Sequence, residues 1–250
     1  MGKAEVAGAF AVVTRAPSPI IPSTALQPGV LFVHGWDSDK AHYQDLSDEI
    51  AALGCVCLTF DMRGHGDDAE AHRDVSREDN LQDVLAAYDA LVRTGLVDPE
   101  AVALIGTSYG GYLAAIASSQ RRVRWLALRV PALYPDAQWD VPKSQLDREA
   151  VARYRSRRVR PEGNRALMAC QAFRGDALVV ESGRDTVVPH PAIASFASAL
   201  RNAHTLSHSC IDKAGHELSA REWQKAYETL LTAWISKQLL RQRGAATVGS

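Results

Sequence analysis

The chain alternates short apolar runs with segments of helical periodicity, and this alternation limits its fold more than any other feature. Strands that are hydrophobic along almost their whole length are buried on both faces, as in a mostly parallel sheet covered by helices. We therefore predict an α/β fold. Strands are expected at 30–33, 55–60, 101–105, 125–130, 177–180 and 205–211, with another within 4–13.

Three long helices are placed by periodicity and end signals. One is expected over 38–53, before Gly54. Another opens at Ser76, where Asp79 three residues later resembles a capping box. A third starts at Ser219 with a similar signal, and its apolar face comprises Trp223, Tyr227, Leu230, Leu231, Trp234 and Ile235.

Composition points to one globular domain over residues 1–250, since 46% of the residues are hydrophobic and 23% charged. With 28 basic and 29 acidic residues, the formal charge of −1 offers no general attraction to nucleic acid or to an anionic membrane. No uncharged apolar run approaches the roughly 18 residues of a membrane span. We expect neither nucleic acid nor membrane as a partner, and the oligomeric state stays open.

Cysteine usage and the N-terminus suggest a reducing compartment. Cys55, Cys57, Cys170 and Cys210 are too few and too scattered for a disulfide framework, and two neighbouring thiols make a poor zinc site. The apolar stretch near the N-terminus contains Glu5 and makes a poor signal peptide. We expect a cytoplasmic protein.

The segment from Gly106 to Gly111 has the pattern G-x-S-x-G, centred on Ser108 and placed between an apolar strand and a helix-like run. The pattern alone is common by chance, and a simple turn with packing glycines is the alternative. In this context, however, a sharp turn would expose the serine hydroxyl at a helix N-terminus and strain its backbone. Ser108 is therefore our candidate nucleophile.

A serine hydroxyl needs a base to remove its proton and a third group to orient that base. Asp185 follows the strand at 177–182, and His216 follows the strand at 205–211. Loops at the carboxyl ends of parallel strands build binding sites. We predict Ser108, Asp185 and His216 as a catalytic triad.

Each partner has competitors. The chain has eight histidines, and a single histidine is more often a surface or hydrogen-bonded residue. Asp185 could simply cap the turn after it, in which case Asp136 or Asp140 would be the acid.

The turn after the strand at 30–33 is the expected oxyanion site, where backbone N–H groups stabilise negative charge in the transition state. We predict Trp36 and Tyr109 as the two donors, each worth about 2.7 to 4 kcal/mol. His34 is expected to be structural.

A cluster at 61–68, followed by His72, contains carboxylates and imidazoles that could bind a divalent metal. It lacks the helical H-x-x-x-H spacing of hydrolytic zinc sites, and its glycines and acids are typical of a loop. We expect no metal and no organic cofactor.

Taken together, these motifs resemble the α/β-hydrolase superfamily over nearly the whole chain. They are His34-Gly35-Trp36, Asp61-x-Arg63-Gly64-His65-Gly66, the Ser108 turn, Gly183-x-Asp185 and Gly215-His216. The resemblance implies a mostly parallel sheet of about eight strands, with Ser108 as nucleophile, His216 as base and Asp185 as orienting acid. It also implies that 61–66 is a scaffold loop.

Within the superfamily, the serine differs from the aspartate of dehalogenases and the cysteine of dienelactone hydrolases. The string from Ser108 to Tyr112 is similar to prolyl oligopeptidase-like peptidases, but a compact carboxylesterase is the better match. We predict a serine hydrolase that cleaves a small-molecule ester. A peptidase, a thioesterase and a noncatalytic ligand-binding module are the alternatives.

Residues 131–173 lie where many members of this superfamily carry a helical lid. Tyr134 and Trp139 are the candidate substrate-binding residues there. The segment is also rich in arginine, which could attract an anionic substrate, although a solvated helix face is the simpler interpretation. The arginines are Arg148, Arg153, Arg155, Arg157, Arg158 and Arg160.

Overall fold

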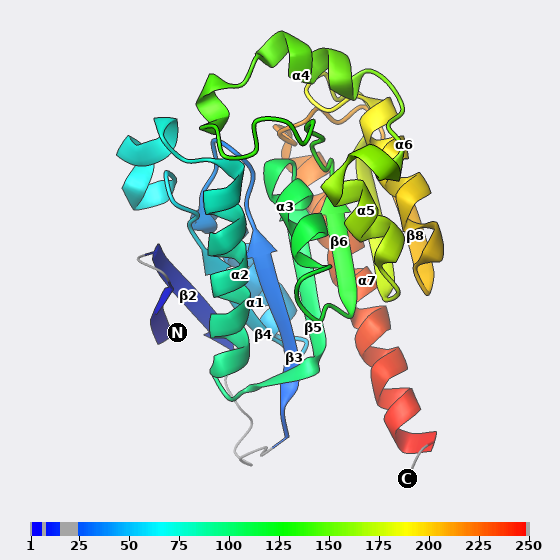
Figure 1. The fold of residues 1–250 in the computed structure, drawn as a ribbon. Coiled ribbons are helices and arrows are strands. Elements are labelled where there is room, and N and C mark those ends of the chain that lie inside the picture. The colour runs from blue at the N-terminus through cyan, green and yellow to red at the C-terminus, as the bar shows by residue number, and fades with distance from the viewer. Residues whose placement is uncertain (1, 7–8, 16–24, 249–250) are drawn as a thin grey trace.

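The computed structural model describes residues 2–6, 9–15 and 25–248, and its centre is one twisted sheet in the order β1-β2-β4-β3-β5-β6-β7-β8 (Figure 1). The six strands from β4 to β8 are parallel, and β2 joins β4 antiparallel. The strands are β1 (Gly2–Val6), β2 (Ala9–Arg15), β3 (Gln27–Val33), β4 (Val56–Phe60), β5 (Val97–Thr107), β6 (Trp125–Arg129), β7 (Asp176–Ser182) and β8 (Thr205–Ile211).

The apolar runs predicted the strands well, except at the N-terminus. Every run expected to form a strand after residue 25 does so. The expectation of a single strand within 4–13 is wrong, because this stretch forms β1 and β2, which pair antiparallel with Val6 opposite Ala9. A short apolar stretch carries the same pattern whether the chain continues or reverses, so periodicity could not show the reversal.

The helices include the three that the sequence predicted. Ser76 and Asp79 form the expected capping box at the start of α2. The helix expected over 38–53 begins as a 3-10 turn, Lys40–Tyr43, and continues as α1. No helix in the described ranges is long and apolar enough to cross a membrane. The α-helices are α1 (Gln44–Ala51), α2 (Arg77–Arg93), α3 (Tyr109–Ala117), α4 (Arg148–Arg155), α5 (Arg165–Ala172), α6 (His190–Ala199) and α7 (Arg221–Val248).

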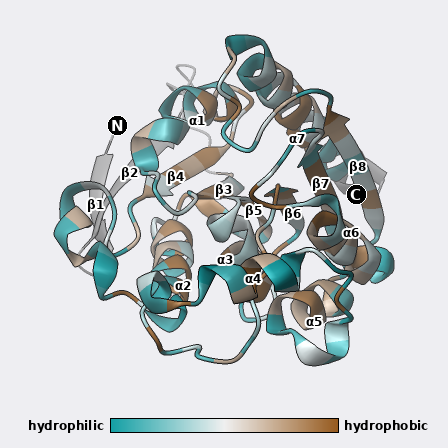
Figure 2. Cartoon of the chain, turned by 90° about the horizontal axis from the view of Figure 1, so that it is seen from above, coloured by the Kyte–Doolittle hydropathy of each residue, from teal (hydrophilic) through white to brown (hydrophobic). Residues whose placement is uncertain are grey.

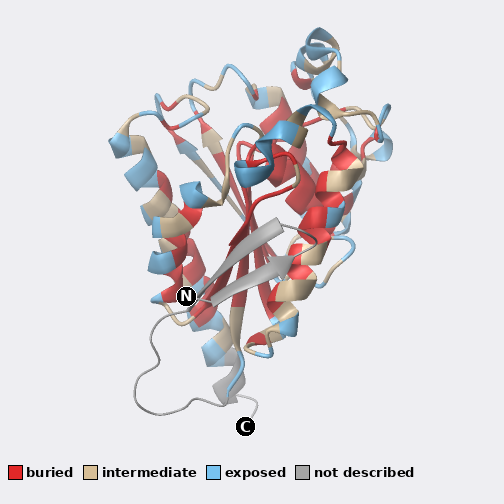
Figure 3. Cartoon of the chain, turned by 90° about the vertical axis from the view of Figure 1, so that its left-hand side faces the viewer, coloured by how far each residue is buried: buried red, intermediate tan, exposed pale blue. Residues whose placement is uncertain are grey.

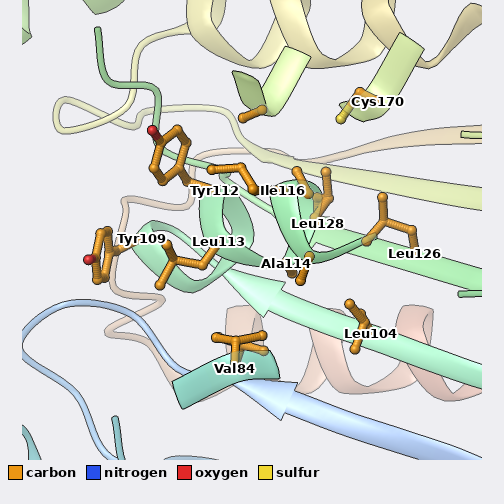
Figure 4. Close-up of a cluster of buried hydrophobic side chains, with 14 of the residues drawn as sticks. Val84, Leu104, Tyr109, Tyr112, Leu113, Ala114, Ile116, Leu126, Leu128 and Cys170 are labelled. Carbon is orange, nitrogen blue, oxygen red and sulfur yellow. The ribbon is translucent and has the colours of Figure 1, made fainter. Parts of the chain in front are cut away.

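Two hydrophobic cores lie on opposite faces of the sheet, because successive strand side chains point to opposite sides. Leu31 and Val33 enter the core covered by α2, α3, α5 and α6, whereas Val30 and Phe32 enter the core covered by α1 and α7. Figure 3 shows the buried sheet between helices whose outer surfaces are exposed. Figure 4 shows how residues of α3, including Tyr112 and Ile116, meet strand and helix side chains in the first core.

The segment 131–173 has two parts with different surroundings. A 3-10 turn, Lys143–Gln145, and helix α4 lie above the carboxyl ends of the strands (Figure 2). Helix α5 instead packs against α3 on the side of the sheet. The first part therefore covers the edge of the sheet where the candidate catalytic residues are found.

Candidate active site

Ser108 occupies a strained turn between β5 and α3. Its backbone has φ 53° and ψ −114°, a conformation that residues other than glycine rarely adopt. The turn is tight enough that a Cβ at Gly106 would lie 2.5 Å from the Gly110 carbonyl oxygen, and a Cβ at Gly110 would lie 2.2 Å from the Val33 carbonyl oxygen. The glycines of the G-x-S-x-G pattern are therefore required by the close approach of β5, α3 and β3.

Three side chains from separate strand ends form one hydrogen-bonded chain. The Ser108 Oγ lies 2.9 Å from His216 Nε2, and His216 Nδ1 lies 2.7 Å from Asp185 Oδ2. With Nδ1–H donating to the carboxylate, Nε2 is free to accept the serine proton. The side chains of Asp185 and His216 are only 3% and 9% exposed, so water competes little for this contact. The geometry fits a nucleophile, a base and an orienting acid.

Asp185 also caps its own turn, so the two interpretations of this residue coexist. Its Oδ1 accepts hydrogen bonds from the amides of Val187 at 2.8 Å and Val188 at 2.7 Å. These bonds fix the carboxylate while Oδ2 faces His216. The other acids lie elsewhere: Asp136 accepts from the Arg165 amide, and Asp140 is exposed.

The two predicted oxyanion donors lie against the turn. A Cβ at Gly35 would be 3.6 Å from the Ser108 Cβ, so the turn that carries Trp36 is in contact with Ser108. Tyr109 begins α3, and its ring meets the Trp36 ring edge-on at 5.2 Å. Within the described part of the chain, neither the Trp36 amide nor the Tyr109 amide donates a hydrogen bond to a protein group. Both are free to bind an oxygen of a ligand.

Arg129, at the end of β6, links Ser108 and His216, the candidate nucleophile and base, and was not found by sequence reasoning. Its backbone carbonyl accepts from the Ser108 amide at 2.9 Å, and its guanidinium donates to the His216 carbonyl at 2.9 Å. The side chain is 5% exposed and lies over the Tyr227 ring. A single charged residue at the end of an otherwise apolar strand was the signal available.

The loop at 61–68 uses its polar groups within the protein. Asp61 accepts from the Lys40 amide at 2.7 Å and pairs with the Lys40 ammonium. His34 accepts from the Met62 amide at 3.1 Å, and His72 Nδ1 bonds to the Gly64 carbonyl at 2.8 Å. Among the described residues, no three His, Cys, Asp or Glu side chains are grouped as metal ligands. These contacts indicate that the loop stabilises the structure next to the candidate site.

Burial affects the imidazoles of this loop. It lowers the pKa of His65 to about 4, because the ring is removed from water and lies near His34 and His72. Burial likewise lowers the pKa of His34. Burial therefore disfavours the imidazolium form of both rings, that of His65 in the loop and that of His34 just after β3.

The structure separates the two candidate substrate-binding residues. Tyr134 lines a cavity of about 530 Å³ that also includes Trp36 and Val187. Trp139 does not line it: its indole N–H donates to Glu78, and the Arg165 guanidinium lies 3.8 Å from the ring centroid. Trp139 is a packing residue of the first core.

Comparison with known proteins agrees with this architecture. The sequence model of a family described as the alpha/beta hydrolase family matches residues 30–243. A sequence search of curated proteins finds no match.

Several solved structures share the fold. Est1E from Butyrivibrio proteoclasticus, solved with ferulic acid, is 18% identical with a TM-score of 0.68, over 98% of this chain and 100% of that one. A monoacylglycerol lipase from Paleococcus ferrophilus is 16% identical with a TM-score of 0.64, over 92% and 98%. A puromycin-hydrolyzing peptidase from Mycobacterium tuberculosis is 19% identical with a TM-score of 0.68, over 92% of this chain and 38% of that one.

These likenesses are too low in identity to carry more than the fold. The sequence model covers well over half of the chain and includes Ser108, Asp185 and His216. This chain therefore belongs to the alpha/beta hydrolase family.

Proposed function

We propose that this protein is a serine hydrolase that cleaves carboxylic esters of small molecules through an acyl-enzyme on Ser108. The observation that carries the proposal is the chain of contacts from hydroxyl to imidazole to carboxylate, at 2.9 and 2.7 Å. The strained backbone of Ser108 adds support, because such strain accumulates at functional sites. A protein that only bound a ligand would need neither feature.

In this mechanism Ser108 Oγ attacks the acyl carbon while His216 Nε2 takes its proton. Asp185 keeps Nδ1 protonated and stabilises the imidazolium that forms. The Trp36 and Tyr109 amides bind the oxyanion, and His216 then protonates the leaving alcohol. Water repeats the sequence on the acyl-enzyme and releases the acid. The residues in these roles require no metal and no organic cofactor.

An ester is favoured over an amide or a thioester by the kind of relatives that share the fold at full length. The monoacylglycerol lipase and Est1E are covered over 98% and 100% of their chains, whereas the peptidase is covered over 38%. A panel of matched p-nitrophenyl esters, thioesters and aminoacyl anilides would separate the three leaving groups.

The direct test is Ser108→Ala. We expect hydrolysis of short p-nitrophenyl esters to fall by roughly a thousandfold or more. A fluorophosphonate probe should label the wild type at Ser108 and leave the variant unlabelled. The matched control is Ser119→Ala, which removes an exposed hydroxyl just beyond the same helix. Unchanged turnover, or a folded wild type that does not react with the probe, would contradict the proposal and favour a binding module.

We also infer that residues 1–250 act as a single domain, with 131–173 as its lid, in the cytoplasm. The lid is supported by the position of α4 above the strand ends (Figure 2), whereas α5, at the end of the segment, packs on the body of the protein against α3. The location is supported by the four free thiols of Cys55, Cys57, Cys170 and Cys210. Cell fractionation would test the location.

A further inference from the structure

A cavity of about 530 Å³ lies beside the candidate active site, under the covering segment; its lining does not include Ser108, Asp185 or His216. Trp36, one of the proposed oxyanion residues, forms part of its wall, and Val187, two residues after Asp185, forms another part. The opposite wall comes from the turn and helix above, with Lys143, Leu146, Arg148, Val151 and Arg155. Its volume is in the range of small-molecule sites. A group of this size can occupy it, and Trp36 connects the cavity to the turn that contacts Ser108.

The walls of this cavity carry an excess of positive charge. Arg73, Lys143, Arg148 and Arg155 line it, and Asp37 is the one carboxylate among its lining residues. Asp37 lies 3.3 Å from the imidazole of His72, which is another lining residue. The lining of the cavity therefore has more cationic side chains than carboxylates.

The Arg155 guanidinium already forms hydrogen bonds within the protein, so it is less available to a ligand. It donates to the Leu133 carbonyl at 2.9 Å and to the Val187 carbonyl at 3.3 Å. It also lies over the Tyr134 ring, 4.5 Å from the centroid, and is 9% exposed. Arg155 therefore holds the covering segment on the body of the protein.

Lys143 differs because its ammonium has no anionic partner. It lies 3.6 Å from the centroid of the Trp36 ring and faces the rings of Tyr109 and Tyr134 at 5.2 and 5.8 Å. Within the described ranges, no carboxylate lies within 4.0 Å of it; the Asp37 carboxylate, which pairs with His72, attracts it only from a longer distance. Burial, reinforced by the nearby Arg155, lowers the pKa of Lys143 to about 7. The free protein thus maintains a costly, partly desolvated amine.

The backbone around Lys143 is fixed, so its position does not result from a loose surface chain. Its amide donates to the Val75 carbonyl at 2.9 Å, and the Ser144 hydroxyl donates to the Arg73 carbonyl at 2.7 Å. Pro142 forms a bridge with Ser76 at the start of α2. The backbone that carries the amine is thus held in place next to Trp36.

We propose that this cavity is a subsite for an anionic group of the substrate, a carboxylate that pairs with the Lys143 ammonium, with the exposed Arg148 at the rim. The proposal rests on the proposed ester hydrolysis and names its substrate class: esters that carry a free carboxylate. The apolar walls formed by Trp36, Leu146 and Val151 would take the carbon skeleton between the two groups. A buried charge pair of this kind gives selectivity, because a neutral analogue leaves the ammonium without a partner.

The test compares matched anionic and neutral esters in wild type and variants. In one pair, mono-p-nitrophenyl glutarate and p-nitrophenyl pentanoate, the carboxylate lies on the acyl side. In the other pair, 4-acetoxybenzoate and 4-acetoxybenzamide, it lies on the alcohol side. The readout is the ratio of kcat/KM for the anionic ester to that for the neutral ester, because a general loss of catalysis cancels in this ratio.

We expect the wild type to favour the anionic member of at least one pair by about tenfold or more, since hydrogen bonds to charged groups are the strong ones. Lys143→Met and Lys143→Gln should lose this preference, and Lys143→Arg should keep it. Lys225→Met removes an exposed lysine that pairs with Glu49 on the surface, and it should behave as the wild type does. The pair that shows the preference identifies the side of the ester that enters the cavity.

A wild type without preference in either pair would overturn the proposal, and so would a preference that survives Lys143→Met. Failure of the proposed function has a different signature, because the wild type would then hydrolyse none of the four esters. In that case binding of pentanoate and pentanamide, measured by thermal shift, decides about the subsite. Stabilisation by the carboxylate alone, lost in Lys143→Gln, supports it, and equal shifts overturn it.

Discussion

The turn around Ser108 and the cavity beneath α4 lie side by side but are built on opposite principles. Around Ser108 the three candidate catalytic side chains satisfy one another: His216 bonds to both Ser108 and Asp185, and Arg129 bonds to the backbone of Ser108 and of His216. In the cavity, Lys143 forms no ion pair with a described carboxylate, and Asp37 attracts it only from a distance. The comparison suggests that the closed network performs the general chemistry, while the unsatisfied cation selects the substrate.

Asp185→Asn tests the closed network and should have the largest effect. The amide would favour the wrong tautomer of His216, and we expect kcat to fall by roughly 10⁴, as in serine proteases. Steady-state kinetics on a neutral p-nitrophenyl ester measure it. The turn should survive, since the Asn carbonyl can still accept from the Val187 and Val188 amides. A loss below tenfold would show that Asp185 only caps its turn.

Arg129→Met should have an intermediate effect, because the residue acts through its neighbours. Without the guanidinium, the carbonyl of His216 loses its donor at 2.9 Å and the loop holding the imidazole gains freedom. We expect kcat to fall by about 10- to 100-fold while KM changes little, as for residues that position a catalytic group. Rescue by Arg129→Lys would show that the cation matters. Equal losses in thermal stability and activity would instead indicate a role in packing alone.

The pH dependence of substrate choice tests the cavity. The pKa of Lys143 is lowered to about 7, so the amine is charged below this pH and neutral above it. The anionic-to-neutral ratio of kcat/KM should therefore be highest near about pH 6 and fall by up to about tenfold toward pH 9, since kcat/KM reports the free enzyme. Effects of pH on the catalytic step itself cancel in the ratio, because both esters depend on the same catalytic residues. The charged or titratable groups around Lys143 on neighbouring elements are Asp37, His72, Arg73, Arg77, Arg148 and Arg155.

Lys143→Arg is the control for this profile, because a guanidinium stays charged over the whole range. Its ratio should not change between these pH values. A sloping ratio in this variant would mean that another group controls the preference.

The smallest effect is expected for stability. Below about pH 7 the ammonium is charged in both states, and its burial costs free energy only in the folded one. Between about pH 7 and 10.4 the unfolded chain binds a proton that the folded chain does not, so the free energy of unfolding rises with pH and the cost disappears. Lys143→Met should therefore stabilise the protein by about 1 to 2 kcal/mol near pH 6, since lost cation–π contacts offset part of the gain.

Denaturant unfolding of wild type and Lys143→Met at pH 6 and pH 10 measures this difference. The gain should shrink at the higher pH. A destabilised variant at pH 6 would show that the ammonium contributes to packing rather than costing stability.

The candidate triad could be predicted because its members stand directly after strands. Parallel strands share one carboxyl edge, so Ser108, Asp185 and His216 were expected together without any knowledge of the loops between them. The two glycines of the motif, Gly106 and Gly110, were also informative. They lie where backbones approach too closely for a side chain, and a short sequence motif is enough to show this. The capping box at Ser76 and Asp79 is equally local, and it predicted the start of α2.

Other features depend on contacts between distant segments. Helix α6, His190–Ala199, was missed because its many small residues give a weak periodic pattern and Pro189 looks like part of a turn. Trp139 was expected in the substrate site but is drawn into the first core by Glu78 and Arg165. Arg155 belongs to a basic run that looked solvated, yet its guanidinium is buried against Leu133.

By itself, the sequence determined the strand and helix pattern, the strained serine turn and the residues that follow each strand, because these are encoded within a few neighbouring positions. Only the tertiary structure decided that Arg129 holds the His216 loop and that Lys143 faces three aromatic rings without an anion. The physical reason is that hydrogen-bond partners and burial are properties of what packs around a residue. The sequence shows that position 143 is a lysine, but it does not show whether this lysine forms an ion pair, is solvated or is buried without an ion-pair partner.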